Sequence, residues 1–123
     1  MIITICGSTR FKDEMLQVAE QLTLQDHIVL MPNVFHHSDD FELSTESKIK
    51  LDNLHKQKID MSDGIFVVNV NGYIGESTFS EIDWAQRHNK TIWFLEEPPQ
   101  EKEETVDEQD VDTTADAASD SDN

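Results

Sequence analysis

Apolar positions along the chain follow two spacings in turn. Four short runs rich in β-branched and other apolar residues indicate strands at residues 1–6, 27–31, 64–70 and 91–95. Between these runs, apolar residues recur every three or four positions among polar ones, which predicts amphipathic helices at about residues 11–24, 44–62 and 78–88. The chain is therefore predicted to fold in the order βαβαβαβ.

This order predicts a parallel sheet. Right-handed crossovers between successive strands give a doubly wound α/β sheet, with strand order 2-1-3-4. The third strand is apolar on both faces, which is typical of a central strand covered by helices on both sides. Because the order reverses between strands one and three, the loops that follow them meet at one crevice, where open α/β sheets bind ligands.

The loop after the third strand, residues 72–78, leads into the strongest candidate for chemistry, Glu81. If Ser77 or Thr78 caps the following helix, Glu81 falls in or just beyond its first turn, where the helix dipole favours an ionised carboxylate. Such a carboxylate can act as a nucleophile. The alternative is that Glu81 only completes a capping box at the start of the helix.

The loop after the first strand is a candidate phosphate site. Gly7, Ser8 and Thr9 offer backbone N–H groups and two hydroxyls, and Arg10 offers a positive charge. The loop fits neither the Walker A pattern nor the GxGxxG fingerprint, and small residues also occur in such turns for steric reasons alone. Its place at the reversal of strand order favours phosphate binding.

Charge divides the chain into two parts. The 123 residues suffice for one small domain, and the formal net charge is −17. Residues 96–123 hold twelve acids, with Lys102 as their only basic residue, and no apolar cluster. We predict an α/β domain at residues 1–95 and a disordered acidic tail at residues 96–123. The domain has no basic patch, so neither nucleic acid nor a membrane surface is expected as a partner.

Cys6 is the sole cysteine, which excludes an intramolecular disulfide and favours a reducing environment. We expect it to behave as a small buried apolar residue. The sequence contains neither a signal-peptide core nor an apolar run long enough to span a membrane. A cytoplasmic location is therefore predicted.

Three histidines, His36, His37 and His55, are expected to have structural or solvent-exposed roles. His36 and His37, with Asp39 and Asp40, include metal-ligand types, but adjacent histidines rarely point at one ion, so a solvated loop is predicted. His55 is expected to be a core or domain-edge residue. It lies within an apolar stripe on the second helix that comprises Leu51, Leu54, Ile59 and Met61. We predict no metal site and no cofactor.

Three segments carry a resemblance to a known family. They are ICGSTR at residues 5–10, IDMSDGIFVV at residues 59–68 and STFSEIDWA at residues 77–85. In this order and spacing, over residues 1 to about 95, they resemble the nucleoside 2-deoxyribosyltransferase-like family, whose relatives include 2'-deoxynucleoside 5'-phosphate N-hydrolases. The resemblance implies a flavodoxin-like sheet and a small-molecule nucleoside or nucleotide as the ligand. It also implies a homo-oligomer, a dimer or larger.

The resemblance gives Glu81 the place of a catalytic glutamate that attacks the anomeric carbon and forms a glycosyl-enzyme ester. Water or a second base then resolves the ester. Gly7, Ser8 and Arg10 match a loop that binds the 5'-phosphate in the N-hydrolase relatives. From the stretch before Glu81, the residues expected to contact the ligand are Gly75, Ser77 and Thr78.

The chain also departs from the family pattern. Residues usual in the family are replaced at Thr4, at His55, near Gly75, and at Ser77 and Asp83. Glu76 is the candidate replacement for a missing carboxylate, and Tyr73 for a missing phenol. Two main hypotheses follow: an enzyme that cleaves or transfers at the N-glycosidic bond of a deoxynucleoside or its 5'-monophosphate, or a protein that binds or sequesters a nucleotide-derived ligand without turnover. A third, weaker one is an interaction module that works through its acidic tail.

Overall fold

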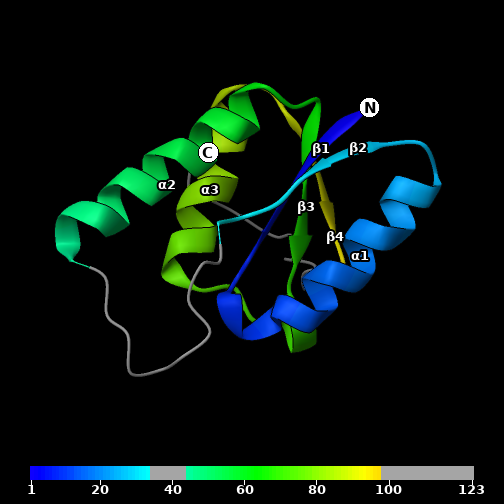
Figure 1. Cartoon of the computed structure of the whole chain (residues 1–123), viewed down its shortest axis with the longest axis horizontal. Coiled ribbons are helices and arrows are strands. Elements are labelled where there is room, and N and C mark those ends of the chain that lie inside the picture. The colour runs from blue at the N-terminus through cyan, green and yellow to red at the C-terminus, as the bar shows by residue number, and fades with distance from the viewer. Residues whose placement is uncertain (34–43, 98–123) are drawn as a thin grey trace, which may run out of the picture.

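The computed structural model describes residues 1–33 and 44–97, which form a Rossmann-like α/β fold (Figure 1). Four parallel strands lie in the order β2-β1-β3-β4, so the predicted fold class and strand order are confirmed. The strands are β1 (Ile2–Gly7), β2 (Ile28–Leu30), β3 (Gly64–Val68) and β4 (Thr91–Phe94). The helices are α1 (Lys12–Leu24), α2 (Thr45–Asp60) and α3 (Glu76–Arg87), with short 3₁₀ turns η1 (Thr9–Phe11) and η2 (Val70–Gly72).

The sheet is covered on both faces. Helix α1 packs on one face, and α2 and α3 pack together on the other, as Figure 1 shows. Successive residues of β1 point to opposite faces, so Ile5 joins the core under α1 with Met15 and Val18, whereas Cys6 joins the core under α2 and α3. The two faces of β1 therefore contribute to two separate clusters of buried side chains.

β1 and β3 end at the same level of the sheet, because Gly7 pairs with Val68 in their register. A Cβ atom on Gly7 would lie 3.0 Å from the carbonyl oxygen of Val68 and 3.4 Å from the sulfur of Met15. Gly7 thus has a steric reason to be glycine, in addition to any contact with a ligand.

Helix α3 begins earlier than predicted. Its N-cap is Gly75, and Ser77 and Thr78 lie inside the first turn, so the prediction that one of them caps the helix was wrong. Glu81 is consequently the sixth residue of α3, in the second turn, beyond the position from which a capping box reaches back. In contrast, α2 begins at the predicted position, where Ser44 is the N-cap and accepts a hydrogen bond from the backbone N–H of Ser47 at 3.1 Å.

Helix α2 buries a narrower stripe than predicted. His55 and Ile59, four residues apart, face the sheet and are buried, whereas Leu54 is 41% and Met61 is 68% exposed. Successive residues are rotated by about 100° around a helix axis. Leu54, one position before His55, and Met61, two positions after Ile59, therefore face away from this ridge. The longest helix, α2, has 16 residues, and no helix within the described ranges is long and apolar enough to cross a membrane.

The end of the described chain is tied to the loop after β3. Asn69 is 1% exposed, and its side-chain amide donates to the carbonyl of Glu96 at 2.8 Å and accepts from the N–H of Glu96 at 2.9 Å. The carboxylate of Glu96 also accepts from the N–H of Asn71 at 2.7 Å. Glu96, the first residue of the predicted tail, is therefore held on the sheet. Residues 98–123 of that tail lie outside the described residues, as do the histidines and acids at residues 36–40.

Polar contacts also join the two helices on this face. The indole N–H of Trp84 in α3 donates to the carboxylate of Asp60 in α2 at 2.8 Å. The ring of Trp84 lies 4.4 Å from that of His88, centroid to centroid, and Lys56 Nζ lies 5.6 Å from the Trp84 ring centroid. Of these contacts, those of Trp84 with Asp60 and Lys56 connect α3 to α2, whereas the contact with His88 lies within α3 and its C-cap.

Candidate functional site

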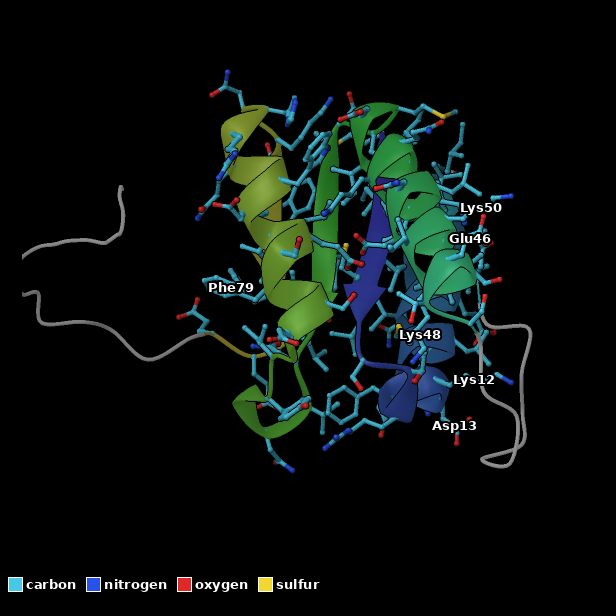
Figure 2. All side chains as sticks on the ribbon, turned by 90° about the vertical axis from the view of Figure 1, so that its left-hand side faces the viewer. Lys12, Asp13, Glu46, Lys48, Lys50 and Phe79 are labelled. Atoms are coloured by element: carbon cyan, nitrogen blue, oxygen red, sulfur yellow. The ribbon has the colours of Figure 1, made fainter. Side chains whose placement is uncertain are left out.

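A pocket of about 550 Å³ lies between α2 and α3, at the carboxyl end of β1. Its volume is within the range of small-ligand sites, and it lies where the reversal of strand order predicts a crevice. Figure 2 shows α2 and α3 side by side in front of the sheet, with Lys48 near the N-terminal end of α2 and Phe79 directed away from α2. The lining residues include Gly7 and Thr9 after β1, Lys48, Asp52 and His55 on α2, and Glu76, Ser77, Ser80 and Glu81 on α3.

Glu81 lines this pocket and is 7% exposed. The pKa of Glu81 is raised to about 7, chiefly by burial. A hydrogen bond with the Cys6 thiol acts to lower the pKa, and the charge of Asp52 acts to raise it. The sequence-based expectation of a carboxylate held ionised by the helix dipole is therefore not met. Glu81 lies beyond the first turn, where the dipole is strong, and desolvation dominates.

His55 faces Glu81 from α2. Its Nε2 atom lies 3.9 Å from Glu81 Oε1 and 3.6 Å from Cys6 Sγ. Burial lowers the pKa of His55 to about 4, and the positive charge of Lys58 contributes to this shift. The imidazole is neutral at pH 7, so its contact with Glu81 is not an ion pair. Its Nδ1 atom is buried and has no hydrogen-bond partner among the described residues.

Cys6 completes this group from the end of β1. The side chain is fully buried, and burial, together with the charge of Glu81, raises the pKa of the Cys6 thiol well above its ordinary value. One donor atom from each of Cys6, His55 and Glu81 lies within 4.8 Å of the other two. We refer to these three residues as the Cys6–His55–Glu81 cluster.

Sequence reasoning assigned Cys6 and His55 to the core and missed their contact with Glu81. The sequence did hold one signal for Cys6. The alternation of side chains along β1 places Cys6 on the face opposite Ile5, near the carboxyl end of the strand. The spacing of His55 and Ile59 likewise placed the histidine on the sheet-facing ridge of α2. The pattern did not show that α2 and α3 pack side by side over the same strand.

The structure brings together five of the predicted site residues around the pocket. They are Gly7, Thr9, Glu76, Ser77 and Glu81. Glu76, the candidate second carboxylate, is exposed in the first turn of α3. The pocket also contains two charged residues that sequence reasoning did not select, Lys48 and Asp52, and Asp52 pairs with Lys56 at 3.2 Å.

The other predicted residues do not line the pocket. Arg10 lies over the ring of Tyr73, with Cζ 4.2 Å from the ring centroid and Nη2 3.4 Å from the phenol oxygen. Ser8 caps η1 by accepting from the N–H of Arg10 at 3.3 Å. Gly75 caps α3, and Thr78 is 3% exposed in the core beside it. Arg10 must therefore leave Tyr73 to contact a ligand in the pocket.

Comparison of the chain with protein-family models, with curated proteins and with solved structures found no match. The case for a function thus rests on the pocket, on the cluster beneath it and on the motifs in the sequence.

Proposed function

We propose that this protein cleaves or transfers at the N-glycosidic bond of a deoxynucleoside or deoxynucleoside 5'-monophosphate, with Glu81 as the nucleophile. The observation that carries the proposal is the position of Glu81, which is buried yet lines a small-molecule pocket at the carboxyl end of β1. A glutamate in the second turn of its helix, without a capping role, is free to act on a ligand.

In the proposed reaction, ionised Glu81 attacks the anomeric carbon, and the bond between that carbon and the base nitrogen breaks. The base leaves with the electron pair and takes a proton, while the sugar stays on Glu81 as an ester. Attack by water yields the free sugar, and attack by a second base yields a new nucleoside, each with loss of a proton and release of Glu81. Among the described lining residues, Glu76 and Asp52 are the further carboxylates that can donate or accept these protons.

We place the phosphate of a monophosphate ligand beside Gly7 and Thr9, in the loop after β1 that the sequence predicts as a phosphate site. Lys48 is the only lysine or arginine among the described lining residues, so we add it to Arg10 as a candidate partner for the phosphate. Figure 2 shows Lys48 on the side of the molecule where α1 begins with Lys12 and Asp13. The proposed homo-oligomer stays a prediction, to be measured by light scattering.

Incubation of the full chain with deoxynucleosides and their 5'-monophosphates, with and without an acceptor base, tests the proposal by chromatography of free base. We expect base release by the wild type, none by Glu81→Gln, and nearly full activity in the matched variant Asp83→Asn, which alters an acid of the same helix that pairs with Arg87 and does not line the pocket. Equal activity of Glu81→Gln and the wild type would contradict the nucleophile assignment.

A second candidate function is binding of the same class of ligand without turnover. Two observations favour it: the carboxyl of Glu81 is partly protonated at pH 7, and Thr4, at a position where the family usually has tyrosine, is fully buried. Its hydroxyl bonds with Ser62 and with the carbonyl of Lys58, so it is occupied within the core. Saturable calorimetric binding of a nucleotide without base release would support this function over the enzyme.

A further inference from the structure

Three chemically different donor groups converge beneath the pocket from three separate elements. Cys6 comes from the end of β1, His55 from α2 and Glu81 from α3. His55 Nε2 lies 3.6 Å from Cys6 Sγ and 3.9 Å from Glu81 Oε1, and all three donor atoms lie within 4.8 Å of one another. A sulfur, an imidazole nitrogen and a carboxylate oxygen at such distances resemble the ligand set of a metal site.

We propose that the Cys6–His55–Glu81 cluster binds a zinc ion. Tetrahedral zinc has bonds of about 2.0–2.3 Å to these atom types, which puts neighbouring ligand atoms about 3.3–3.7 Å apart. The contact between Nε2 and Sγ, at 3.6 Å, already has this length. The contact between Nε2 and Oε1, at 3.9 Å, is longer, and Sγ lies within 4.8 Å of the carboxylate oxygen, so the Glu81 carboxylate has to move toward the other two ligands when the ion binds.

Charge balance supports a divalent ion. A Cys6 thiolate and a Glu81 carboxylate together carry two negative charges, and a neutral His55 adds none. A doubly charged cation makes the buried cluster neutral, which removes the cost of placing two like charges in a poorly solvated site. The mixture of thiolate, imidazole and carboxylate selects zinc over the oxygen-seeking ions magnesium and calcium.

The imidazole of His55 has unused bonding capacity. The residue is 5% exposed, and its Nε2 atom contacts a sulfur at 3.6 Å. Its Nδ1 atom forms no hydrogen bond of full geometry with the described residues, although the Ile5 backbone is near enough to the ring to raise the pKa of His55. A buried polar ring with so few partners is uncommon in a purely structural role. A bond from Nε2 to zinc would use the lone pair that faces the cluster.

The proposed site has an open side. His55 and Glu81 line the pocket, whereas Cys6 lies below them and does not. Three protein ligands therefore leave the fourth position of a tetrahedral ion directed at the pocket, where water or a pocket ligand can occupy it. This inference goes beyond the proposed function, and it implies that zinc inhibits base release, because a Glu81 carboxylate bound to zinc is not available as a nucleophile.

Cobalt(II) titration of the metal-free full-length protein gives a sharp test, because Cys6 is the only cysteine in the chain. A thiolate-to-cobalt charge-transfer band can then arise from Cys6 alone. We expect this band, together with intense visible bands of tetrahedral cobalt, to saturate at one ion per chain and to disappear on addition of zinc. Cys6→Ala and His55→Ala should abolish the bands, whereas His88→Ala, the matched control at an exposed histidine, should retain them.

Two further measurements keep the outcome clear. Circular dichroism of the metal-free variants shows whether they fold, and zinc should raise the melting temperature of the wild type but not of Cys6→Ala. Binding of cobalt without a thiolate band, including binding at the histidines and acids of residues 36–40, would overturn the proposal, as would an unchanged band in His55→Ala. None of these readouts depends on nucleoside cleavage, so a failure of the proposed function leaves this test intact.

Discussion

His55 Nε2 lies 3.9 Å from Glu81 Oε1, and the burial that these two residues share shifts their pKa values in opposite directions. Glu81 has a pKa of about 7 in the folded chain against a reference value of 4.5, so its ionisation disfavours folding as the pH rises through this interval. His55 has a pKa of about 4 against 6.5, so the folded state gains stability as the pH rises through that interval. Between pH 4.5 and 6.5 the two effects oppose each other.

Glu81→Gln should isolate the contribution of Glu81 to the pH dependence of stability. The wild type loses stability as the Glu81 carboxyl ionises, and the variant does not. Its free energy of unfolding should therefore increase, relative to that of the wild type, by about 2 kcal/mol as the pH rises from 4.5 to 6.5. Urea denaturation at several pH values measures this difference, and subtraction of the wild-type curve removes the contribution of the exposed acids. A difference curve that is flat with pH would contradict the raised pKa of Glu81.

His55→Gln should have the reverse effect. The uncompensated Glu81 carboxyl then lowers the free energy of unfolding, relative to the wild type, by a similar amount over the same pH interval. The same denaturation series measures it. If His55→Gln instead followed the wild type, the lowered pKa of the histidine would be wrong.

The proposed reaction should depend on pH through Glu81. Only the ionised carboxylate attacks, so kcat/KM for base release should increase about ten-fold per pH unit below pH 7 and level off above it, since burial places the pKa of Glu81 at about 7. Initial rates in buffers of constant ionic strength measure this profile. A rate that falls steadily from pH 5 to pH 8 would indicate that the protonated form of Glu81 is the active one.

Phosphate recognition should depend on Lys48. Lys48→Gln is expected to reduce affinity for a 5'-monophosphate about ten-fold while changing affinity for the nucleoside little, because a charge-assisted hydrogen bond contributes about 1.5–3 kcal/mol. Calorimetry with both ligands gives the ratio. Arg10→Gln is the comparison, and a larger loss in that variant would mean that Arg10 leaves Tyr73 to bind the phosphate.

Two truncations should differ in stability. Removal of residues 98–123 is expected to leave the melting temperature nearly unchanged, because an acidic segment without an apolar cluster adds little to a core. Removal of residues 96–123 also deletes both partners of the Asn69 side chain, and unpaired polar groups on a buried amide should cost about 1–3 kcal/mol. Equal melting temperatures for the two truncations would contradict a stabilising role for Glu96.

The strand order could be predicted because it depends on features that are local in sequence. Apolar runs separated by amphipathic helices predict parallel strands joined by right-handed crossovers. This arrangement places Gly7 and the loop after β3 at the carboxyl ends of the two central strands. The start of α3 could not be placed in the same way. Ser77 and Thr78 are favoured at N-caps, yet Gly75 adopts the extended conformation of the cap, and a shift of two residues moves Glu81 into the second turn.

The contacts of Glu81 depend on tertiary packing, which the pattern does not encode. His55 precedes Glu81 by 26 positions and approaches it only because α2 and α3 cover the same face of the sheet. The engagement of Arg10 with Tyr73 is a similar case, since a cation at a predicted phosphate loop instead lies over an aromatic ring from the loop after β3. In both cases the environment of a predicted site residue depends on a partner that is distant in sequence.

The hydrogen bond between Trp84 and Asp60 makes the fluorescence of Trp84 sensitive to the distance between α2 and α3. An indole whose N–H bonds to a carboxylate and whose ring lies beside an imidazole emits differently from one that has lost both neighbours. The other tryptophan, Trp93, lies on β4 away from this contact, so Trp93→Phe isolates the signal of Trp84. Any ligand that separates or draws together the two helices beside the pocket will therefore change the emission of a single native residue, without the attachment of a dye.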